Sequence, residues 1–229
     1  MPRPDPGQGV FETLLLRDRR VQALDAHLQR LERSTLALYD LSLPAATRTR
    51  ITDALTRAAA GHPPPQRARI DAVSRDGRLD VTLTISAVPP RRPVALAPLV
   101  IPGGLGAHKW RDRRLVEPGD TAPVPLIVDE DGTVLEAAWA NVWLLDGAVL
   151  TTPPLDGRIL PGVTRARLLA LAPRLGLRVR ERPLTLADAR AAGTLFLTSS
   201  LRLAVPASFA RRPQDRPAVD RLRDALAAS

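Results

Sequence analysis

Three of the chain's Asp-Gly pairs are each set between strand-like runs, and they most constrain how the sequence can fold. Asp76-Gly77 separates two runs of alternating apolar and polar residues, ARIDAVSR and RLDVTLTIS. Asp131-Gly132 lies in LIVDEDGTVLE, and Asp146-Gly147 joins NVWLL to AVLTT. Asp-Gly favours the tight, positive-φ turns that connect antiparallel strands. The sequence therefore predicts a β-hairpin at each of these places.

Helical patterns lie between the strand regions. Leucines recur at helical spacing from Leu24 to about Tyr39, with Asp25 as the expected N-cap. A second helix is expected between Pro44 and Gly61. Further helices are expected after Pro161-Gly162, after the Thr185 cap with Asp188, and at the C-terminal end. Because no strand-helix-strand unit repeats, we predict an α+β fold.

A flexible stretch, PGGLG, suggests the division of the chain into domains. We predict an N-terminal α/β domain at 1–101, a linker at 102–107 and a C-terminal domain at 108–229. His27, Arg30 and Ser34 share one face of the first helix, and we expect that face to be solvated.

The composition excludes several classes of function. The absence of Cys rules out disulfides and thiol chemistry, and the three His are too scattered to predict a metal site. No apolar run is long enough for a membrane span and the N-terminus lacks a secretory core, so we expect a cytoplasmic protein with no membrane partner. The net charge of +9 admits nucleic-acid binding. However, the cations are dispersed and aromatic residues are few, so we expect no nucleic-acid partner.

Lys109 is the single lysine among 33 Lys and Arg residues. Arg can replace Lys as a surface charge, but a guanidinium cannot act as a nucleophile, a Schiff-base partner or a general base. The pattern therefore marks Lys109 as a candidate reactive amine, with compositional accident as the alternative.

Other segments offer partners for such an amine. Pro161-Gly162 forces a turn before Val163 and Thr164, whose amides would form an anion cup at a helix N-terminus; alternatively, Thr164 merely caps the helix. Glu136 ends a strand, and Ser200 belongs to a hydroxyl cluster at a strand exit. An amine, a phosphate cup, a cation and a carboxylate together suggest pyridoxal 5'-phosphate as cofactor.

Six ordered stretches carry a family resemblance over residues 7 to about 207. They are GQGVFET, DAHLQRLERS, HKW, DGTVLEAAWANVWLL, TTPPLDGRILPGVTR and LFLTSSLRLAVP. In this order they resemble the signature stretches of the class IV, or fold type IV, pyridoxal-phosphate enzymes. That family includes branched-chain and D-amino-acid aminotransferases and 4-amino-4-deoxychorismate lyases. The resemblance implies two α/β domains with the cofactor in the cleft, usually in a homodimer.

The resemblance also implies residue roles. Lys109 would form the Schiff base, and Glu136 would pair with the pyridine nitrogen. Leu160 would pack against the ring, and Asn141 would support the strand of Glu136. The phosphate would be held by Arg30, the amides of Val163 and Thr164, and Ser200.

Departures from the family pattern favour a lyase. Arg114 stands where many aminotransferases have Tyr, and Ser199-Ser200 with the following Leu-Arg resembles the lyases. The N-terminal stretch is shorter than is usual in the family. Candidates for the two carboxylates of a small anionic amine substrate are Arg111, Arg113 and Arg202.

Three functions are therefore considered. The first is 4-amino-4-deoxychorismate lyase, which makes 4-aminobenzoate and pyruvate for folate synthesis. The second is a class IV aminotransferase acting on branched-chain or D-amino acids. The third, of a different class, is a non-catalytic basic nucleic-acid-binding protein.

Overall fold

The computed structural model describes residues 3–61, 64–90, 92–117, 123–210 and 216–229. These residues form two compact units, each considered by itself. The N-terminal unit comprises the described residues up to 90 together with 108–115. The C-terminal unit comprises 92–107 and the described residues from 116 onwards.

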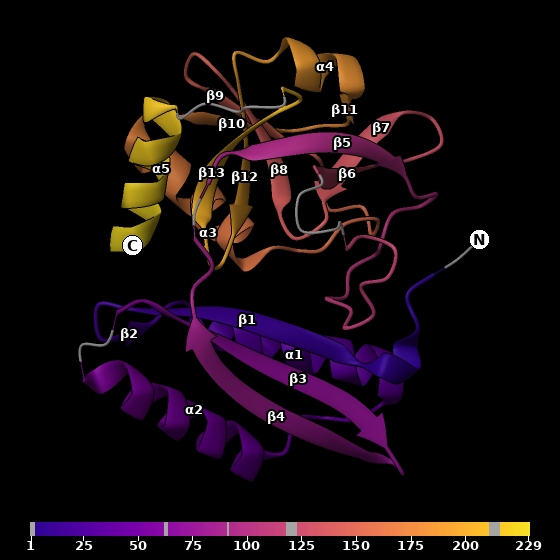
Figure 1. Cartoon of the computed structure of the whole chain (residues 1–229), viewed down its shortest axis with the longest axis vertical. Coiled ribbons are helices and arrows are strands. Elements are labelled where there is room, and N and C mark those ends of the chain that lie inside the picture. The colour runs from indigo at the N-terminus through magenta and orange to yellow at the C-terminus, as the bar shows by residue number, and fades with distance from the viewer. Residues whose placement is uncertain (1–2, 62–63, 91, 118–122, 211–215) are drawn as a thin grey trace. The chain divides into compact units, whose positions relative to one another are not determined.

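The N-terminal unit is a four-stranded antiparallel sheet with two helices (Figure 1). Its strand order is β2-β1-β3-β4. The elements are η1 (Pro6–Gln8), β1 (Val10–Arg17), β2 (Arg20–Val21), α1 (Leu24–Tyr39), α2 (Ala45–Ala60), β3 (Gln66–Arg75) and β4 (Arg78–Ala87). Alternate residues of β3, among them Ile70, are fully buried on the sheet face that contacts α1, and Leu14 of β1 lies on the same face. The period of two predicted from the sequence thus matches the buried face.

The C-terminal unit is built on a nine-stranded mixed sheet with the order β10-β9-β8-β12-β13-β5-β6-β7-β11. Its strands are β5 (Val94–Val100), β6 (Val124–Val128), β7 (Thr133–Ala137), β8 (Asn141–Asp146), β9 (Val149–Thr152), β10 (Arg178–Glu181), β11 (Leu184–Thr185), β12 (Thr194–Ser199) and β13 (Leu203–Ser208). Its helices are α3 (Val163–Leu171), η2 (Ala172–Leu175), α4 (Leu186–Ala191) and α5 (Pro217–Ala228). A bridge between Ala137 and Ala140 joins β7 to β8, although these strands are far apart in the sheet order. The sheet is therefore curled.

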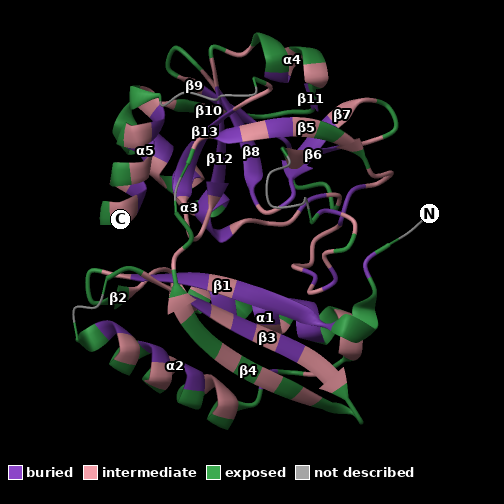
Figure 2. Ribbon diagram, in the orientation of Figure 1, coloured by how far each residue is buried: buried purple, intermediate pink, exposed green. Residues whose placement is uncertain are grey.

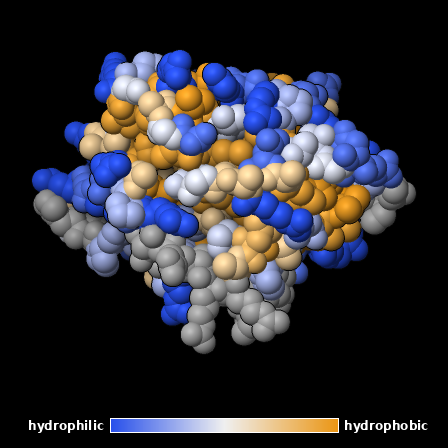
Figure 3. Space-filling view, turned by 90° about the horizontal axis from the view of Figure 1, so that it is seen from above, coloured by the Kyte–Doolittle hydropathy of each residue, from blue (hydrophilic) through white to orange (hydrophobic). Residues whose placement is uncertain are grey.

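The core of the C-terminal unit lies along this curled sheet, where Figure 2 shows long buried stretches of strand. The Trp143 ring stacks on Phe196, and its Nε1 donates to Thr198 Oγ1 at 2.9 Å. A buried indole N–H needs such an acceptor. On the molecular face shown in Figure 3, hydrophobic and hydrophilic side chains are intermixed.

The three predicted hairpins are confirmed. Asp76 and Gly77 have φ of 48° and 71°, as a tight hairpin turn between β3 and β4 requires. Asp131-Gly132 lies between the antiparallel β6 and β7, and Asp146-Gly147 between β8 and β9. The Thr185 cap is also confirmed, because its side chain and that of Asp188 form a reciprocal capping box.

The units differ from the predicted domains in two segments. β5, expected in the N-terminal domain at 1–101, pairs with β6 and β13 of the C-terminal unit. Residues 108–115, expected at the start of the 108–229 domain, belong to the N-terminal unit. The chain therefore passes between the units more than once, because long-range strand pairing rather than local composition decides which residues pack together.

Two predictions about α1 are wrong. The N-cap residue is Ala23, in a left-handed conformation, and Asp25 lies within the first turn. His27, Arg30 and Ser34 are buried instead of solvated. The physical reason is that β1 places a carboxylate beneath this helix face.

That carboxylate is Glu12, which is 1% exposed. Arg30 donates two hydrogen bonds to it, at 2.7 and 2.8 Å, and His27 Nδ1 lies 2.7 Å away. Burial raises the pKa of Glu12, but the charge of Arg30 and the hydrogen bonds from His27 and Arg30 outweigh it and lower the pKa to about 2. Burial lowers the pKa of His27 despite its hydrogen bond to Glu12. The cluster therefore joins α1 to β1 through a buried ion pair.

We predict that Glu12 contributes to stability in a pH-dependent manner. Because its folded pKa lies below the ordinary value of 4.5, the contribution is complete above about pH 4.5 and is lost as pH falls towards 2. Glu12→Gln should lower the free energy of unfolding at neutral pH by about 3–5 kcal/mol, the usual cost of breaking a buried pair. Urea denaturation at pH 7 and pH 3 should show the gap between variant and wild type narrowing at the lower pH.

Asp80→Asn is the control. Asp80 pairs with Arg75 across the exposed β3–β4 hairpin at 3.8 Å, so this change should cost less than about 1 kcal/mol at either pH. A Glu12→Gln deficit that stays the same at both pH values would contradict the assignment.

Candidate active site

The backbone of Leu160 is held from both sides in the C-terminal unit. Its N–H donates to the carboxylate of Glu136, with distances of 3.3 and 3.4 Å to the two oxygens. Its carbonyl accepts from Asn141 Nδ2 at 2.9 Å. Glu136 is the penultimate residue of β7 and is 5% exposed, and Asn141 begins β8. The tight β7–β8 connection therefore positions Leu160 and the loop that carries it.

The start of α3 lies against the same asparagine. Gly162 is the N-cap, and a Cβ built on it would fall 1.9 Å from Asn141 Oδ1, so the backbone approach requires glycine. Gly162 has no side chain with which to cap the helix. The amides of Val163 and Thr164, in the first turn, are among those without an intrahelical acceptor. This arrangement favours an anion cup over a helix capped by Thr164.

The exit of β12 adjoins this assembly through strand pairing. Thr198 of β12 is in register with Asn141 of β8, and Ser200 follows the end of that strand. Thr198 itself is buried and accepts from the indole of Trp143. Its hydroxyl thus has a structural role, whereas Ser200 is half-buried at the strand exit.

Arg202 lies on an aromatic ring of the β7–β8 connection. Its guanidinium carbon is 4.4 Å from the centre of the Trp139 ring, a cation–π distance. Burial lowers the pKa of Arg202 from its ordinary value, although a guanidinium stays charged. One unit therefore supplies six predicted site residues around the ends of β7, β8 and β12. They are Glu136, Leu160, Val163, Thr164, Ser200 and Arg202.

Lys109 belongs to the N-terminal unit, where its segment runs along the start of β1. Its carbonyl accepts from Phe11 N–H at 2.8 Å, and Arg111 N–H donates to the carbonyl of Gly9 at 3.0 Å. Lys109 Nζ lies 4.8 Å from the centre of the Phe11 ring, and Arg69 Cζ lies 4.0 Å from the same centre. The ring thus orients the amine and a neighbouring cation together.

The residues after Lys109 form polar contacts within the same unit. Arg111 Nε lies 2.8 Å from an Asp71 oxygen, and its NH1 donates to the Gln8 carbonyl. Arg114 donates to the buried carboxylate of Asp112 at 2.8 and 2.9 Å. Hydrogen bonds from Arg114 and from the Asp5 amide lower the pKa of Asp112. Arg113 is half-buried.

Arg30, predicted to bind phosphate, is in the buried pair with Glu12 described above. Sequence reasoning missed Glu12 and Trp139 as neighbours of predicted site residues, and it placed His27 beside Arg30 without predicting that both are buried. A signal was present for Glu12, because a carboxylate within the apolar run GVFETLLL is rare unless it is paired.

Among the described residues, no group of three or more His, Asp or Glu side chains is placed to hold a metal ion. No helix in the described part of the chain is long and apolar enough to span a membrane.

Comparison with known proteins identifies the family. The family model for class IV amino-transferases matches residues 9–116 and 119–208. A Methanocaldococcus jannaschii protein, provisionally named branched-chain-amino-acid aminotransferase, is 39% identical over 80 residues. That match covers 35% of this chain and 28% of the relative, so the chain spans little more than a quarter of that relative's length.

Solved structures resemble the chain over nearly its whole length. The PLP-bound form of a hypothetical aminotransferase from Mycobacterium tuberculosis has a TM-score of 0.82 and 26% identity, covering 100% of this chain and 93% of that one. A Legionella pneumophila protein, provisionally named 4-amino-4-deoxychorismate lyase, has a TM-score of 0.80 and covers 97% and 91%; at 21% identity it shows the fold alone. The predicted fold type IV architecture is confirmed. The chain belongs to the class IV aminotransferases, a family of PLP-dependent enzymes.

Proposed function

We propose that this protein is a PLP-dependent 4-amino-4-deoxychorismate lyase, which converts its substrate into 4-aminobenzoate and pyruvate. The assembly around Leu160 is the observation that carries the cofactor assignment. It joins a buried carboxylate, Glu136, to a helix start at Gly162 whose amides suit a phosphate. The departures from the aminotransferase pattern support lyase over transaminase.

The residues present fit the cofactor. The amides of Val163 and Thr164 and the hydroxyl of Ser200 would hold the phosphate, because a helix N-terminus favours an anion. The close approach of Gly162 to Asn141 fixes the direction of these amides. The family resemblance assigns Arg30 to the phosphate as well, although two of its nitrogens already donate to Glu12.

Glu136 and Leu160 would hold the cofactor ring. A buried carboxylate favours a protonated ring nitrogen, and the Leu160 hydrogen bond fixes the orientation of that carboxylate. When bound, pyridoxal phosphate supplies a ring that withdraws electrons from the substrate carbon that loses its proton.

Lys109 would hold the cofactor covalently, and its released amine would take the proton from the amine-bearing carbon of the substrate. The Phe11 ring beneath Lys109 Nζ restrains the lysine chain. The bond between the ring carbon and the enolpyruvyl oxygen then breaks, the departing enolpyruvate takes up one proton to become pyruvate, and the ring becomes aromatic.

Arg residues would bind the two substrate carboxylates. Arg202 is the strongest candidate, because its guanidinium lies over the Trp139 ring beside the exit of β12 and is partly desolvated. Arg113 is a second candidate. Arg111 is already engaged with Asp71 and Gln8, which favours a structural role for it. The family resemblance also supports a homodimer.

We predict that Lys109→Ala abolishes covalent attachment of the cofactor. After incubation with pyridoxal phosphate and borohydride, wild type should gain one pyridoxyl phosphate group by intact-mass spectrometry, and the variant none. Turnover should fall at least about 1,000-fold, because the nucleophile and base are lost together. Lys109→Arg is the matched control, since it keeps the charge but cannot condense with an aldehyde. Reduced cofactor retained in Lys109→Ala would rule out this role.

We also predict that the purified enzyme forms 4-aminobenzoate and pyruvate in equal amounts from 4-amino-4-deoxychorismate. Product fluorescence and coupled lactate dehydrogenase would measure the two. The second candidate is aminotransfer with branched-chain or D-amino acids, and the name of the Methanocaldococcus jannaschii relative supports its branched-chain form. Amino-group exchange with a keto acid, without 4-aminobenzoate, would reject the lyase. A colourless protein with salt-sensitive oligonucleotide binding would instead support a basic nucleic-acid-binding module.

A further inference from the structure

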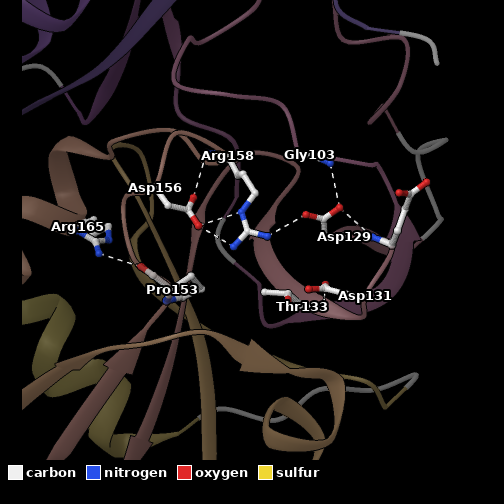
Figure 4. Close-up of polar contacts among 9 residues, drawn as sticks. Gly103, Asp129, Asp131, Thr133, Pro153, Asp156, Arg158 and Arg165 are labelled. Carbon is white, nitrogen blue, oxygen red and sulfur yellow. Dashed lines mark hydrogen bonds and ion pairs between the residues drawn. The ribbon is translucent and has the colours of Figure 1, made fainter.

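Arg158 lies in the loop that leads to Leu160, and its guanidinium bridges two carboxylates (Figure 4). Its Nε and NH2 donate to Asp156 Oδ2 at 2.9 and 2.6 Å, and its NH1 donates to Asp129 Oδ2 at 2.8 Å. The Arg158 amide also donates to Asp156 Oδ1. One guanidinium therefore ties the 153–161 loop to the β6–β7 turn.

The same network holds the glycine-rich stretch that precedes Lys109 in the chain. Asp129 Oδ1 accepts from Gly103 N–H at 2.9 Å, and the Arg158 carbonyl accepts from Gly106 N–H at 3.1 Å. A Cβ on Gly104, whose φ is +67°, would fall 2.2 Å from that carbonyl oxygen. The glycine stretch thus packs directly on the backbone of Arg158, which explains why glycine is required there.

The network is charged and partly exposed to solvent. The side chains of Arg158, Asp129 and Asp156 are 28%, 16% and 34% exposed. The Gly103 amide and Arg158 hydrogen bonds lower the pKa of Asp129 to about 2. Hydrogen bonds to Asp156 and Asp129 raise the pKa of Arg158. All three groups are therefore ionised at neutral pH, and their hydrogen bonds are of the strong, charge-assisted kind.

We propose that Arg158 is a positioning residue for cofactor binding, which rests on the function proposed above. Arg158 stands two residues before Leu160 and four before Gly162, and the stretch it holds ends three residues before Lys109. It acts through Leu160 and the amides of α3 rather than by touching the cofactor. By restraining this loop, Arg158 reduces the conformational entropy that the loop would otherwise lose when the cofactor binds.

The test compares Arg158→Met with a matched variant, Arg182→Met. Arg182 pairs with Asp188 at 3.3 Å in the same unit, with side chains 48% and 31% exposed, so it controls for the loss of an Arg–Asp pair. Equilibrium titration with pyridoxal phosphate should show at least about tenfold weaker binding for Arg158→Met, the effect of losing strong hydrogen bonds that hold the loop. Arg182→Met should bind like wild type, and Arg158→Lys, which reaches one carboxylate, should lie between.

A second readout needs no cofactor. Hydrogen exchange at the Gly103 and Gly106 amides should be faster in Arg158→Met apoprotein than in Arg182→Met apoprotein. Unchanged affinity in Arg158→Met, or equal weakening in Arg182→Met, would overturn the positioning role while leaving the proposed function intact. Failure of wild type to bind pyridoxal phosphate would instead reject the proposed function and this role with it.

Asp156→Asn provides a second variant if Arg158→Met does not fold. It removes one charged partner and leaves the Arg158–Asp129 pair in place. Cofactor binding should then weaken by a smaller factor, with wild-type affinity again overturning the proposal.

Discussion

The candidate site of the C-terminal unit depends on the hydrogen bonds that hold the backbone of Leu160 to residues on either side of the β7–β8 connection. Glu136 and Asn141 satisfy both backbone polar groups of one loop residue, so the loop cannot shift without leaving hydrogen-bonding groups unpaired. Glu136 and Asn141 lie near each other because the sheet curls and the Ala137–Ala140 bridge joins the end of β7 to the start of β8. The close contact between Gly162 and Asn141 also restrains the start of α3.

Arginine side chains bridge buried oxygen atoms in both units. Arg30 pairs with Glu12 in one unit, and Arg165, 2% exposed, reaches both the Pro153 carbonyl and Glu181 in the other. A planar guanidinium can satisfy several oxygens at once, which suits such bridging sites better than an ammonium group. The count of 33 Lys and Arg residues therefore overstates the free basic surface, because many of these cations serve as structural bridges to carboxylates. The single lysine stands apart because a guanidinium cannot supply its chemistry.

Two arginines on which the proposed lyase function rests have defined partners in the structure. Arg114, where many aminotransferases carry Tyr, is committed to the buried Asp112. Arg202 is stacked on Trp139. A half-desolvated arginine favours a carboxylate partner over an apolar side chain, because the charge must be compensated. We therefore propose Arg202 as a partner for a substrate carboxylate.

The sequence by itself determined the elements whose signals are local. Asp76-Gly77 and the other hairpin turns, and the capping box of Thr185 and Asp188, depend on the φ preferences and short-range hydrogen bonds of neighbouring residues. The family motifs likewise identified Lys109 and Glu136 as site candidates, without showing their surroundings. Only the tertiary structure decided that β5 joins the nine-stranded sheet and that the polar face of α1 is buried over Glu12. Those outcomes depend on pairing between residues far apart in the chain, and no local pattern encodes which distant carboxylate or strand edge will meet them.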